Sequence, residues 1–402
     1  MALPSARKET GNWHTSRWTS VDRSQKLAGP LISWGQKSSG AFLKFVRSLI
    51  VKPLVRLVED HTKSTTELNP SSDRIVELAW GFAPLLILKS ALDHGLFDAL
   101  DRAPKTVEEL QRETGASERG LQSILNALAG LRFLVKLDGN RFALTPESAS
   151  FLVSSRPEFH GGIIAHAVDR RLPSWLRISE AVRNGYTQAD GSEPETDSAY
   201  FAQWVEALFP IFYPGARALA DALKLSRSHA PITGLDIAAG SGVWGIGLAQ
   251  ASSQMEVTAV DWPAVIEVTR RVVARNGVAE QFRFVEGDIL AGADFGRNHR
   301  VAVLGHILHG LDRQQNQALL QRTYDALAPG GSIAIAEFLV DKDRTGPVHS
   351  LVFAVSMMVH SPQGDTYSFE EISKWLIEAG FVDIRSLGIP GPSPLILATR
   401  PR

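Results

Sequence analysis

Residues 231–250, PITGLDIAAGSGVWGIGLAQ, decide the fold of this chain. A short apolar run leads into the turn AAGSGVWG, and an apolar helical pattern follows it. A strand, a glycine-rich turn and a helix in this order are typical of α/β sheets that bind nucleotides, because glycine lets the backbone approach a ligand closely. The glycines in question are Gly240, Gly242 and Gly245. No Lys-Ser/Thr pair follows them, which excludes a phosphate-binding P-loop.

Downstream of this turn the sequence alternates between strand and helix patterns. VTAVDW, FRFVEGDIL and VAVLGHIL are predicted strands, which implies a parallel, doubly wound sheet with a ligand crevice at the carboxyl ends of its strands. Asp261 lies 25 residues after Asp236 and closes the second strand, where a carboxylate can accept both hydroxyls of a ribose. Asp288 ends the third strand and could receive an adenine amino group. Helix capping by these acids, or dinucleotide binding, fits the same pattern.

The composition is that of an ordinary soluble globular protein. Apolar residues make up 44% and charged residues 21%, and a net charge of -1 argues against electrostatic binding of nucleic acid by the whole molecule. No stretch supplies the ~20 uncharged apolar residues of a membrane span, so an integral membrane protein is not expected. Zero cysteines exclude disulfides and thiolate metal sites and suit a reducing compartment. We therefore expect a cytoplasmic protein.

Residues 1–70 form a segment of a different kind. They carry a net charge of +6 against -7 for the remainder, and up to about residue 40 they show no sustained period, which predicts a partly disordered basic leader. Residues 41–58, AFLKFVRSLIVKPLVRLV, form a basic amphipathic helix. This helix could pack on its own domain or on a partner subunit, or it could make peripheral contact with an anionic membrane surface. A transit peptide is disfavoured by Glu9 and Asp22.

Residues 71–157 are predicted to be a winged helix. The segment 73–100 is apolar on nearly all sides, which suits a buried or subunit-swapped helix pair, and Thr106 with Glu109 predicts a capping box. FLVKLDGNRFALT predicts a small hairpin. The segment SERGLQSILNALAG, at the place of a DNA-recognition helix, contains Arg119 as its only positively charged side chain. DNA binding calls for several phosphate contacts, so a dimerisation module is favoured. Residues 158–228 are predicted to be a helical linker and substrate region with a polar loop at 185–198, and 229–402 are predicted to form the ligand-binding α/β domain.

The glycine turn, together with AVDW and GDIL, resembles the S-adenosylmethionine site of class I methyltransferases. Residues 73–400 as a whole are similar to the caffeic acid / acetylserotonin O-methyltransferase family, including ILHGLDRQQNQALLQRTYDALAPGG and MMVHSPQGDTYSFEEISKWLIEAGF. The resemblance implies an α/β fold: a C-terminal Rossmann-like methyltransferase domain behind an N-terminal, mostly α-helical, winged-helix dimerisation domain. It also implies S-adenosyl-L-methionine as the cofactor, a small-molecule acceptor and a homodimer.

Site residues follow from matching the family's motifs position by position. His309 falls on the catalytic histidine, where a neutral imidazole can take a proton from an acceptor hydroxyl, and Glu337 falls on the acid that orients it. No metal is required. The cofactor-binding residues implied are Asp236, Gly240, Gly242, Asp261, Trp262, Asp288 and Ile289. The acceptor-binding residues implied are Met357, Met358, His360 and Asp365, with His166, Trp175 and Phe209 as further candidates.

Two positions depart from the family's pattern. Gly310 stands where an aspartate usually follows the histidine, and Thr366 stands where a second acid lies beside it, with Asp365 one residue earlier. These departures motivate a rival, a relative that keeps the cofactor but methylates carbon or performs a non-methylating cyclisation or hydroxylation. A winged-helix regulator that senses the cofactor is the rival of another class. An apolar pocket favours an aromatic or polyketide-like acceptor.

Overall fold

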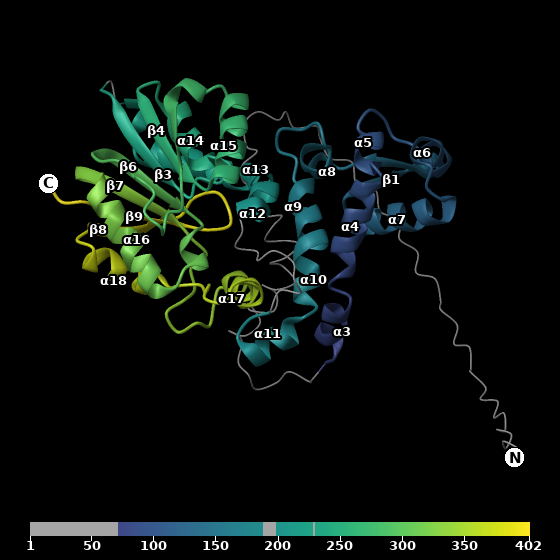
Figure 1. Ribbon diagram of the computed structural model, residues 1–402. Coiled ribbons are helices and arrows are strands. Elements are labelled where there is room, and N and C mark those ends of the chain that lie inside the picture. Colours follow the sequence, from purple (N-terminus) through teal and green to yellow (C-terminus); the bar gives the residue numbers. More distant parts are fainter. Residues whose placement is uncertain (1–70, 188–197, 228–229) are drawn as a thin grey trace, which may run out of the picture.

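The computed structural model describes residues 71–187, 198–227 and 230–402. The predictions for the basic leader 1–70, including the amphipathic helix 41–58, lie outside the described residues. The described chain forms an N-terminal helical lobe and a C-terminal α/β lobe, with a layer of helices between them (Figure 1).

The N-terminal lobe has the winged-helix pattern that the sequence predicts. Its elements are α3 (Asp73–Ala79), α4 (Ala83–Asp93), α5 (Leu96–Leu100), α6 (Val107–Thr114), α7 (Glu118–Gly130), β1 (Leu134–Leu137), β2 (Arg141–Leu144) and α8 (Pro146–Phe151). The capping box is present, because the Glu109 N–H donates to Thr106 Oγ1 and the Thr106 N–H donates to Glu109 Oε2. β1 and β2 pair in antiparallel register as the wing. Phe97, Phe133 and Phe142 fill the core of this lobe.

Part of the apolar segment 73–100 is exposed in the single chain, which fits the subunit-swapped alternative of the sequence prediction better than the buried one. α3 has no buried residue, and Ile75, Leu78, Trp80 and Phe82 are each more than half exposed. The helical stretch Asp73–Asp93 is not free of charge, since it contains Glu77 and Lys89, but by length and overall composition it is apolar enough to cross a membrane, a test that core helices of soluble proteins also pass. An exposed apolar face of this kind is typical of a protein–protein or membrane contact surface.

Helices between the two lobes form the middle layer. They are α9 (Gly161–His166), η4 (Ala167–Arg171), α10 (Leu172–Trp175), α11 (Ile178–Asn184), α12 (Ser198–Trp204), η5 (Val205–Leu208) and α13 (Phe209–Ala222). η4 is a π-helical turn that continues directly from α9. Such turns insert an extra residue and redirect side chains, and they are frequent at functional sites.

The C-terminal lobe is built on one seven-stranded sheet of order β5-β4-β3-β6-β7-β9-β8. The strands are β3 (Ile232–Ile237), β4 (Met255–Asp261), β5 (Phe282–Glu286), β6 (His299–Gly305), β7 (Leu327–Ala336), β8 (Val382–Leu387) and β9 (Leu395–Thr399). The first five strands in this order are parallel, as predicted, and β9 pairs antiparallel with both β7 and β8. The third and fourth predicted strands are shorter than expected, since they end at Glu286 and Gly305.

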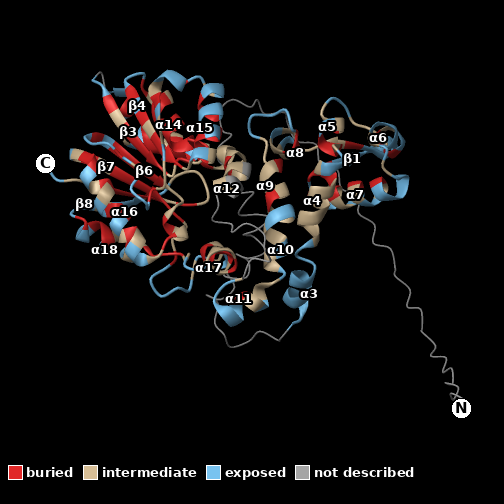
Figure 2. Cartoon of the chain, in the orientation of Figure 1, coloured by how far each residue is buried: buried red, intermediate tan, exposed pale blue. Residues whose placement is uncertain are grey.

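Helices cover both faces of this sheet and make it the most buried part of the chain (Figure 2). α13, α14 (Val243–Ala251) and α15 (Pro263–Arg275) pack on one face, and α16 (Arg313–Ala326) and α18 (Phe369–Glu378) pack on the other. Neighbouring strand residues point to opposite faces, so Ala259 and Val260 join different cores. α17 (Val348–His360) lies against the middle layer.

The direction in which successive strands are added to the parallel part of the sheet reverses at β3. β3 is followed outward by β4 and β5 on one side, and β6 and β7 then lie on the other side. Ligands of open α/β sheets bind at such a switch point, at the carboxyl ends of the strands. The glycine turn, Asp261, His306 and Glu337 all follow or end strands at this edge.

Candidate active site

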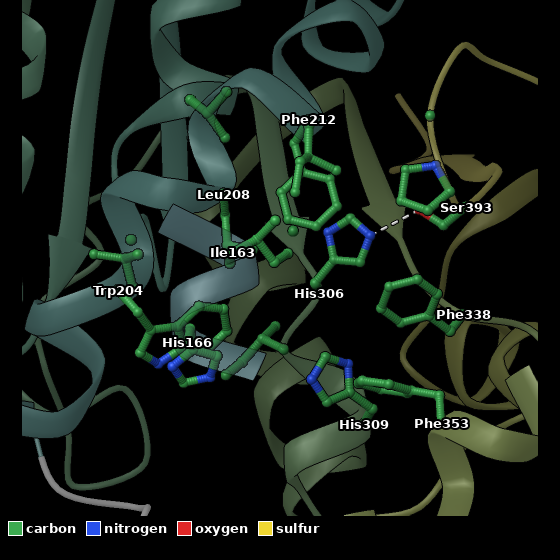
Figure 3. A pocket seen from close by; sticks show the side chains of 18 of the residues that line it. Ile163, His166, Trp204, Leu208, Phe212, His306, His309, Phe338, Phe353 and Ser393 are labelled. Atoms are coloured by element: carbon green, nitrogen blue, oxygen red, sulfur yellow. Dashed lines mark hydrogen bonds between the residues drawn. The ribbon is translucent and has the colours of Figure 1, made fainter. Parts of the chain in front are cut away.

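A cavity of about 1420 Å³ lies at this edge, and both lobes and the middle layer line it. Ordinary small-molecule pockets measure roughly 300–1,000 Å³. The cavity is therefore large enough for two small molecules side by side. Figure 3 shows part of its wall, in which aromatic and imidazole rings predominate.

The glycine turn forms one end of the cavity, but its residues have different tasks. Gly240, with φ +57°, lines the cavity. Gly242 does not line it, and a Cβ there would lie 2.9 Å from Thr269 Cγ2, so this glycine permits the turn to pack on α15. Gly245 likewise packs inward, where a Cβ would lie 2.9 Å from Val257 Cγ1. The prediction that Gly242 faces a ligand therefore needs correction.

Asp236 also lies behind the cavity rather than in it. The carboxylate is fully buried, and its Oδ2 accepts the Gly245 N–H at 2.8 Å. Burial raises the pKa of Asp236 to about 8. This hydrogen bond ties the first turn of α14 to β3. Asp236 therefore stabilises the glycine turn from behind and does not line the cavity, contrary to the prediction that it contacts the cofactor.

Asp261 lines the cavity at the end of β4 and is nine-tenths buried. Its Oδ2 accepts the Gly240 N–H at 2.8 Å, and its Oδ1 accepts the Trp262 N–H at 2.7 Å. Each carboxylate oxygen has two lone-pair directions, so one remains on each oxygen. Burial raises the pKa of Asp261 to about 6, against the effect of these two backbone donors. The carboxylate is thus held in a fixed orientation with two adjacent acceptor sites.

The predicted adenine end is made by apolar groups rather than by a carboxylate. Trp262, Gly287 and Ile289 line the cavity there. Asp288 is not among the lining residues, and its Oδ1 accepts the Leu290 N–H at 2.7 Å within its own turn. The side chain of Asp288 therefore shapes the loop after β5.

His309 and Glu337 meet as the sequence predicts. His309 lies in the short 3-10 turn η8 (Leu308–Gly310), and its Nδ1 is 2.8 Å from Glu337 Oε1. Glu337 follows β7, is fully buried, and also accepts the His309 N–H on Oε2 and the Phe338 N–H on Oε1. Burial alone would raise the pKa of Glu337, but the neighbouring His309 holds that pKa below its usual value. The carboxylate is thus charged and points at the imidazole.

Aromatic rings close around the exposed edge of His309. The ring of Phe353 on α17 meets it edge-on at 4.8 Å between centroids, and Phe338 lies 6.2 Å away. The His309 side chain is 16% exposed and lines the cavity (Figure 3). Asn316 fixes the turn from below by donating to the carbonyls of Leu308 and Leu311.

His306 is a cavity residue that the sequence analysis did not single out. It follows β6 with φ +60°, a left-handed conformation, and its Nε2 lies 2.7 Å from Ser393 Oγ. Its ring stacks on Phe212 at 4.0 Å (Figure 3). Burial lowers the pKa of His306 to about 4, so it is a neutral imidazole. The only sequence signal was the Gly-His pair at the strand end, since Phe212 and Ser393 come from distant segments.

The predicted acceptor residues divide between the cavity and its surroundings. Met357, His360 and His166 line the cavity, whereas Met358, Trp175 and Phe209 do not. Asp365 lies outside as well, 3.6 Å from Arg344, although its backbone N–H donates to the His309 carbonyl. Thr366 is fully buried. Gly310 lines the cavity, and a Cβ there would meet nothing within 4 Å, so the missing aspartate leaves open space.

Comparison with known proteins assigns both lobes. Residues 76–154 match the O-methyltransferase dimerisation domain, and residues 218–382 match the O-methyltransferase domain. A 3-hydroxy-5-methyl-1-naphthoate 3-O-methyltransferase from Streptomyces sahachiroi is 30% identical over 326 residues, which cover 79% of this chain and 92% of that protein. The chain belongs to the O-methyltransferase family.

Further relatives of this O-methyltransferase agree. The tetracenomycin polyketide synthesis 8-O-methyl transferase TcmO of Streptomyces glaucescens is 28% identical, covering 82% of this chain and 96% of that protein. Human N-acetylserotonin methyltransferase, solved in complex with S-adenosylmethionine, shares the fold with a TM-score of 0.73 at 22% identity, covering 84% of this chain and 100% of that chain. The predicted family, fold class and enzyme class are confirmed, and S-adenosylmethionine is the cofactor.

The residues at the glycine turn fit this cofactor. The two remaining acceptor sites on Asp261 match the paired hydroxyls of a ribose, and Gly240 leaves the space beside Val205 free of a side chain. Trp262 and Ile289 offer apolar surface to a base. No group of three or more His, Asp or Glu residues suited to a metal ion occurs within the described ranges.

The pKa of Asp261 predicts how cofactor affinity depends on pH. Only the carboxylate offers two acceptors, so protonation below pH 6 should weaken binding by about tenfold per pH unit. Calorimetry with S-adenosylhomocysteine between pH 7.5 and 5 measures this. Asp261→Asn is the control, because its weaker affinity should not change over the same range. A flat profile in the unchanged protein would contradict the role of Asp261.

Proposed function

We propose that this enzyme methylates a hydroxyl of a small aromatic or polyketide-like acceptor, with His309 as the general base. The contact between His309 Nδ1 and Glu337 Oε1 carries the proposal. Because the charged Glu337 accepts a hydrogen bond from Nδ1–H, the neutral imidazole keeps its lone pair on Nε2. Nε2 is the atom left to remove a proton from an acceptor in the cavity.

Glu337 supports this proton transfer in a second way. When His309 takes the proton it becomes a cation, and the buried carboxylate 2.8 Å away stabilises that cation. Bound S-adenosylmethionine supplies the activated methyl group. The protein's other contribution is position, because an acceptor held at near-attack distance needs little further activation.

The walls of the cavity favour a flat, apolar acceptor. Trp204, Phe212, Phe338 and Phe353 present rings, and Met357 adds an adaptable apolar side chain. The relatives acting on a hydroxy-naphthoate and in tetracenomycin polyketide synthesis support an acceptor of this chemistry.

A deuterium-labelled cofactor tests the reaction type. The enzyme is incubated with methyl-deuterated S-adenosylmethionine and a panel of hydroxylated naphthalenes and anthraquinones, and the labelled position is found by mass spectrometry and NMR. Label on a hydroxyl oxygen supports the proposal. Label on carbon, or cofactor turnover without methyl transfer, favours the rival that the open space at Gly310 motivates.

We also propose that two copies of this chain pair through α3 and α4. The match of residues 76–154 to a dimerisation domain and the exposed apolar face of Ile75, Leu78, Trp80 and Phe82 support this. A homodimer would remove that face from water.

Charged substitutions on this face should separate the subunits. Leu78→Asp with Trp80→Asp would place two carboxylates in the apolar contact, and each is costly to bury without a partner. Light scattering at micromolar concentration should then give half the mass of the unchanged protein. Ile377→Asp on α18 is the matched control, since Ile377 is 64% exposed and lies in the other lobe. A double variant that stays dimeric would place the contact elsewhere.

A further inference from the structure

Arg171 is the only lysine or arginine among the described residues that line the cavity. It ends the π-helical turn η4, which directs its side chain toward α17. The rest of the lining is mostly apolar or carries neutral rings, apart from the carboxyls of Asp261 at the glycine turn and Glu147 in the N-terminal lobe. A permanent positive charge in such surroundings is costly unless an anion accompanies it.

The guanidinium is held in place by neutral groups. Its Nε donates to His166 Nε2 at 3.2 Å, and its Nη1 donates to Ser356 Oγ at 3.0 Å. It also lies 5.6 Å from the ring of Trp204, which stacks on His166 (Figure 3). No carboxylate within the described ranges pairs with it. Nη2 keeps both of its N–H groups and Nη1 keeps one of its two, and a planar guanidinium can present such neighbouring N–H groups to one carboxylate.

The two histidines nearest Arg171 do not change this charge balance. Burial, together with the neighbouring charge of Arg171, lowers the pKa of His166 to about 4. The pKa of His360 is about 4 for the same two reasons, against a raising contact with the Ser356 carbonyl. Both are neutral near pH 7, so the cluster carries one positive charge.

Arg171 and His309 lie along one wall of the cavity. Ser356, which holds the guanidinium, is three residues after Phe353 on α17, and the Phe353 ring packs 4.8 Å from His309. Three residues of an α-helix are about 4.5 Å of axial rise. Arg171 and His309 thus contact residues on successive turns of α17, on the same cavity.

We propose that Arg171 binds a carboxylate of the acceptor, so that the native acceptor is a hydroxylated aromatic acid whose hydroxyl faces His309. This rests on the proposed function above. Arg171 then determines specificity and takes no part in the proton transfer. A carboxylate is favoured over a phosphate because one guanidinium, without a second cation in the described lining, neutralises one negative charge.

An acid and its ester test this directly. The acceptors are 3-hydroxy-1-naphthoate and its methyl ester, which share the ring and the hydroxyl and differ in charge. We expect the unchanged enzyme to prefer the acid, and Arg171→Gln to lower the acid-to-ester ratio of kcat/KM by about 10- to 100-fold, the scale of one or two hydrogen bonds between charged groups. Arg171→Lys, which keeps the charge without the fork, should give an intermediate ratio.

Arg170→Gln is the matched control, because Arg170 is exposed and does not line the cavity. It should keep the ratio of the unchanged enzyme. Thermal melting and S-adenosylhomocysteine affinity confirm that each variant is folded. If Arg171→Gln lowers kcat/KM equally for the acid and the ester, Arg171 only ties η4 to α17 and the proposal is overturned.

A binding measurement separates this proposal from the proposed function. Fluorescence titration of the S-adenosylhomocysteine-loaded protein with 1-naphthoate and with its methyl ester needs no turnover. Tighter binding of the acid that is lost in Arg171→Gln supports the carboxylate site even if no acceptor is methylated. Equal binding of both probes overturns the carboxylate site, and methyl transfer to neutral phenols would still support the proposed function.

Discussion

Replacing His309 by alanine is expected to lower kcat by ~10²–10⁴, the range attributed to general acid–base catalysis. The variant lacks the Nε2 lone pair that we assign to proton removal, while Gly240 and Asp261 at the cofactor end are untouched. Single-turnover measurements with labelled S-adenosylmethionine give the rate constant of the methyl-transfer step. Calorimetry with S-adenosylhomocysteine should show nearly unchanged affinity.

His309→Gln is the better matched variant, because alanine leaves the buried carboxylate of Glu337 without its partner. In His309→Ala, the group that lowers the pKa of Glu337 is gone, so the ionised carboxylate is less stable in the folded state at pH 7. The melting temperature of His309→Ala should therefore fall. An amide N–H at position 309 can still donate to Glu337 but cannot act as a base. Turnover equal to that of the unchanged enzyme in both variants would leave positioning as the only source of catalysis.

Replacing Asp261 by alanine should weaken S-adenosylhomocysteine binding by about 10²–10⁴, since two hydrogen bonds to a charged group contribute about 1.5–3 kcal/mol each. The carboxylate also accepts the Gly240 and Trp262 N–H groups, so its loss loosens the turn as well. Calorimetry at pH 7.5 measures the change.

Asp288→Ala is the control that separates the two predicted cofactor acids. Its carboxylate lies outside the cavity and bonds within its own turn, so its loss should weaken binding by less than about tenfold, the scale of one neutral hydrogen bond. If Asp261→Ala and Asp288→Ala lose the same amount of S-adenosylhomocysteine affinity, the assignment of Asp261 as the ribose-binding residue is wrong.

Part of this site follows from the sequence because it is local. The run from strand to glycine turn to helix fixes Gly240, and the end of the next strand fixes Asp261 beside it. The family resemblance places His309 and Glu337, and the structure brings them to 2.8 Å. Side-chain direction was harder to predict. Asp236 points behind the turn, and the strand before Asp288 stops two residues early.

The acceptor side could not be predicted because its residues come from separate segments. Arg171 reaches Ser356 across 185 positions of sequence, and His306 meets Phe212 and Ser393 from two other elements. No period or spacing in the sequence joins such residues. The π-helical turn that ends at Arg171 also has no clear sequence signature. The sequence left open whether the apolar segment 73–100 is buried in its own chain or against a partner, and α3 is not covered by the chain's own core.

The left-handed backbone at His306 limits the amino acids that position 306 can accept during laboratory evolution of the pocket. Glycine, asparagine, aspartate and histidine tolerate φ near +60°, whereas a β-branched or bulky apolar residue is an outlier there. Mutational libraries at position 306 should therefore yield few folded members beyond those four residues. Phe338 and Phe353 line the same cavity without a positive φ, so new acceptor preferences should be selected at these two positions first.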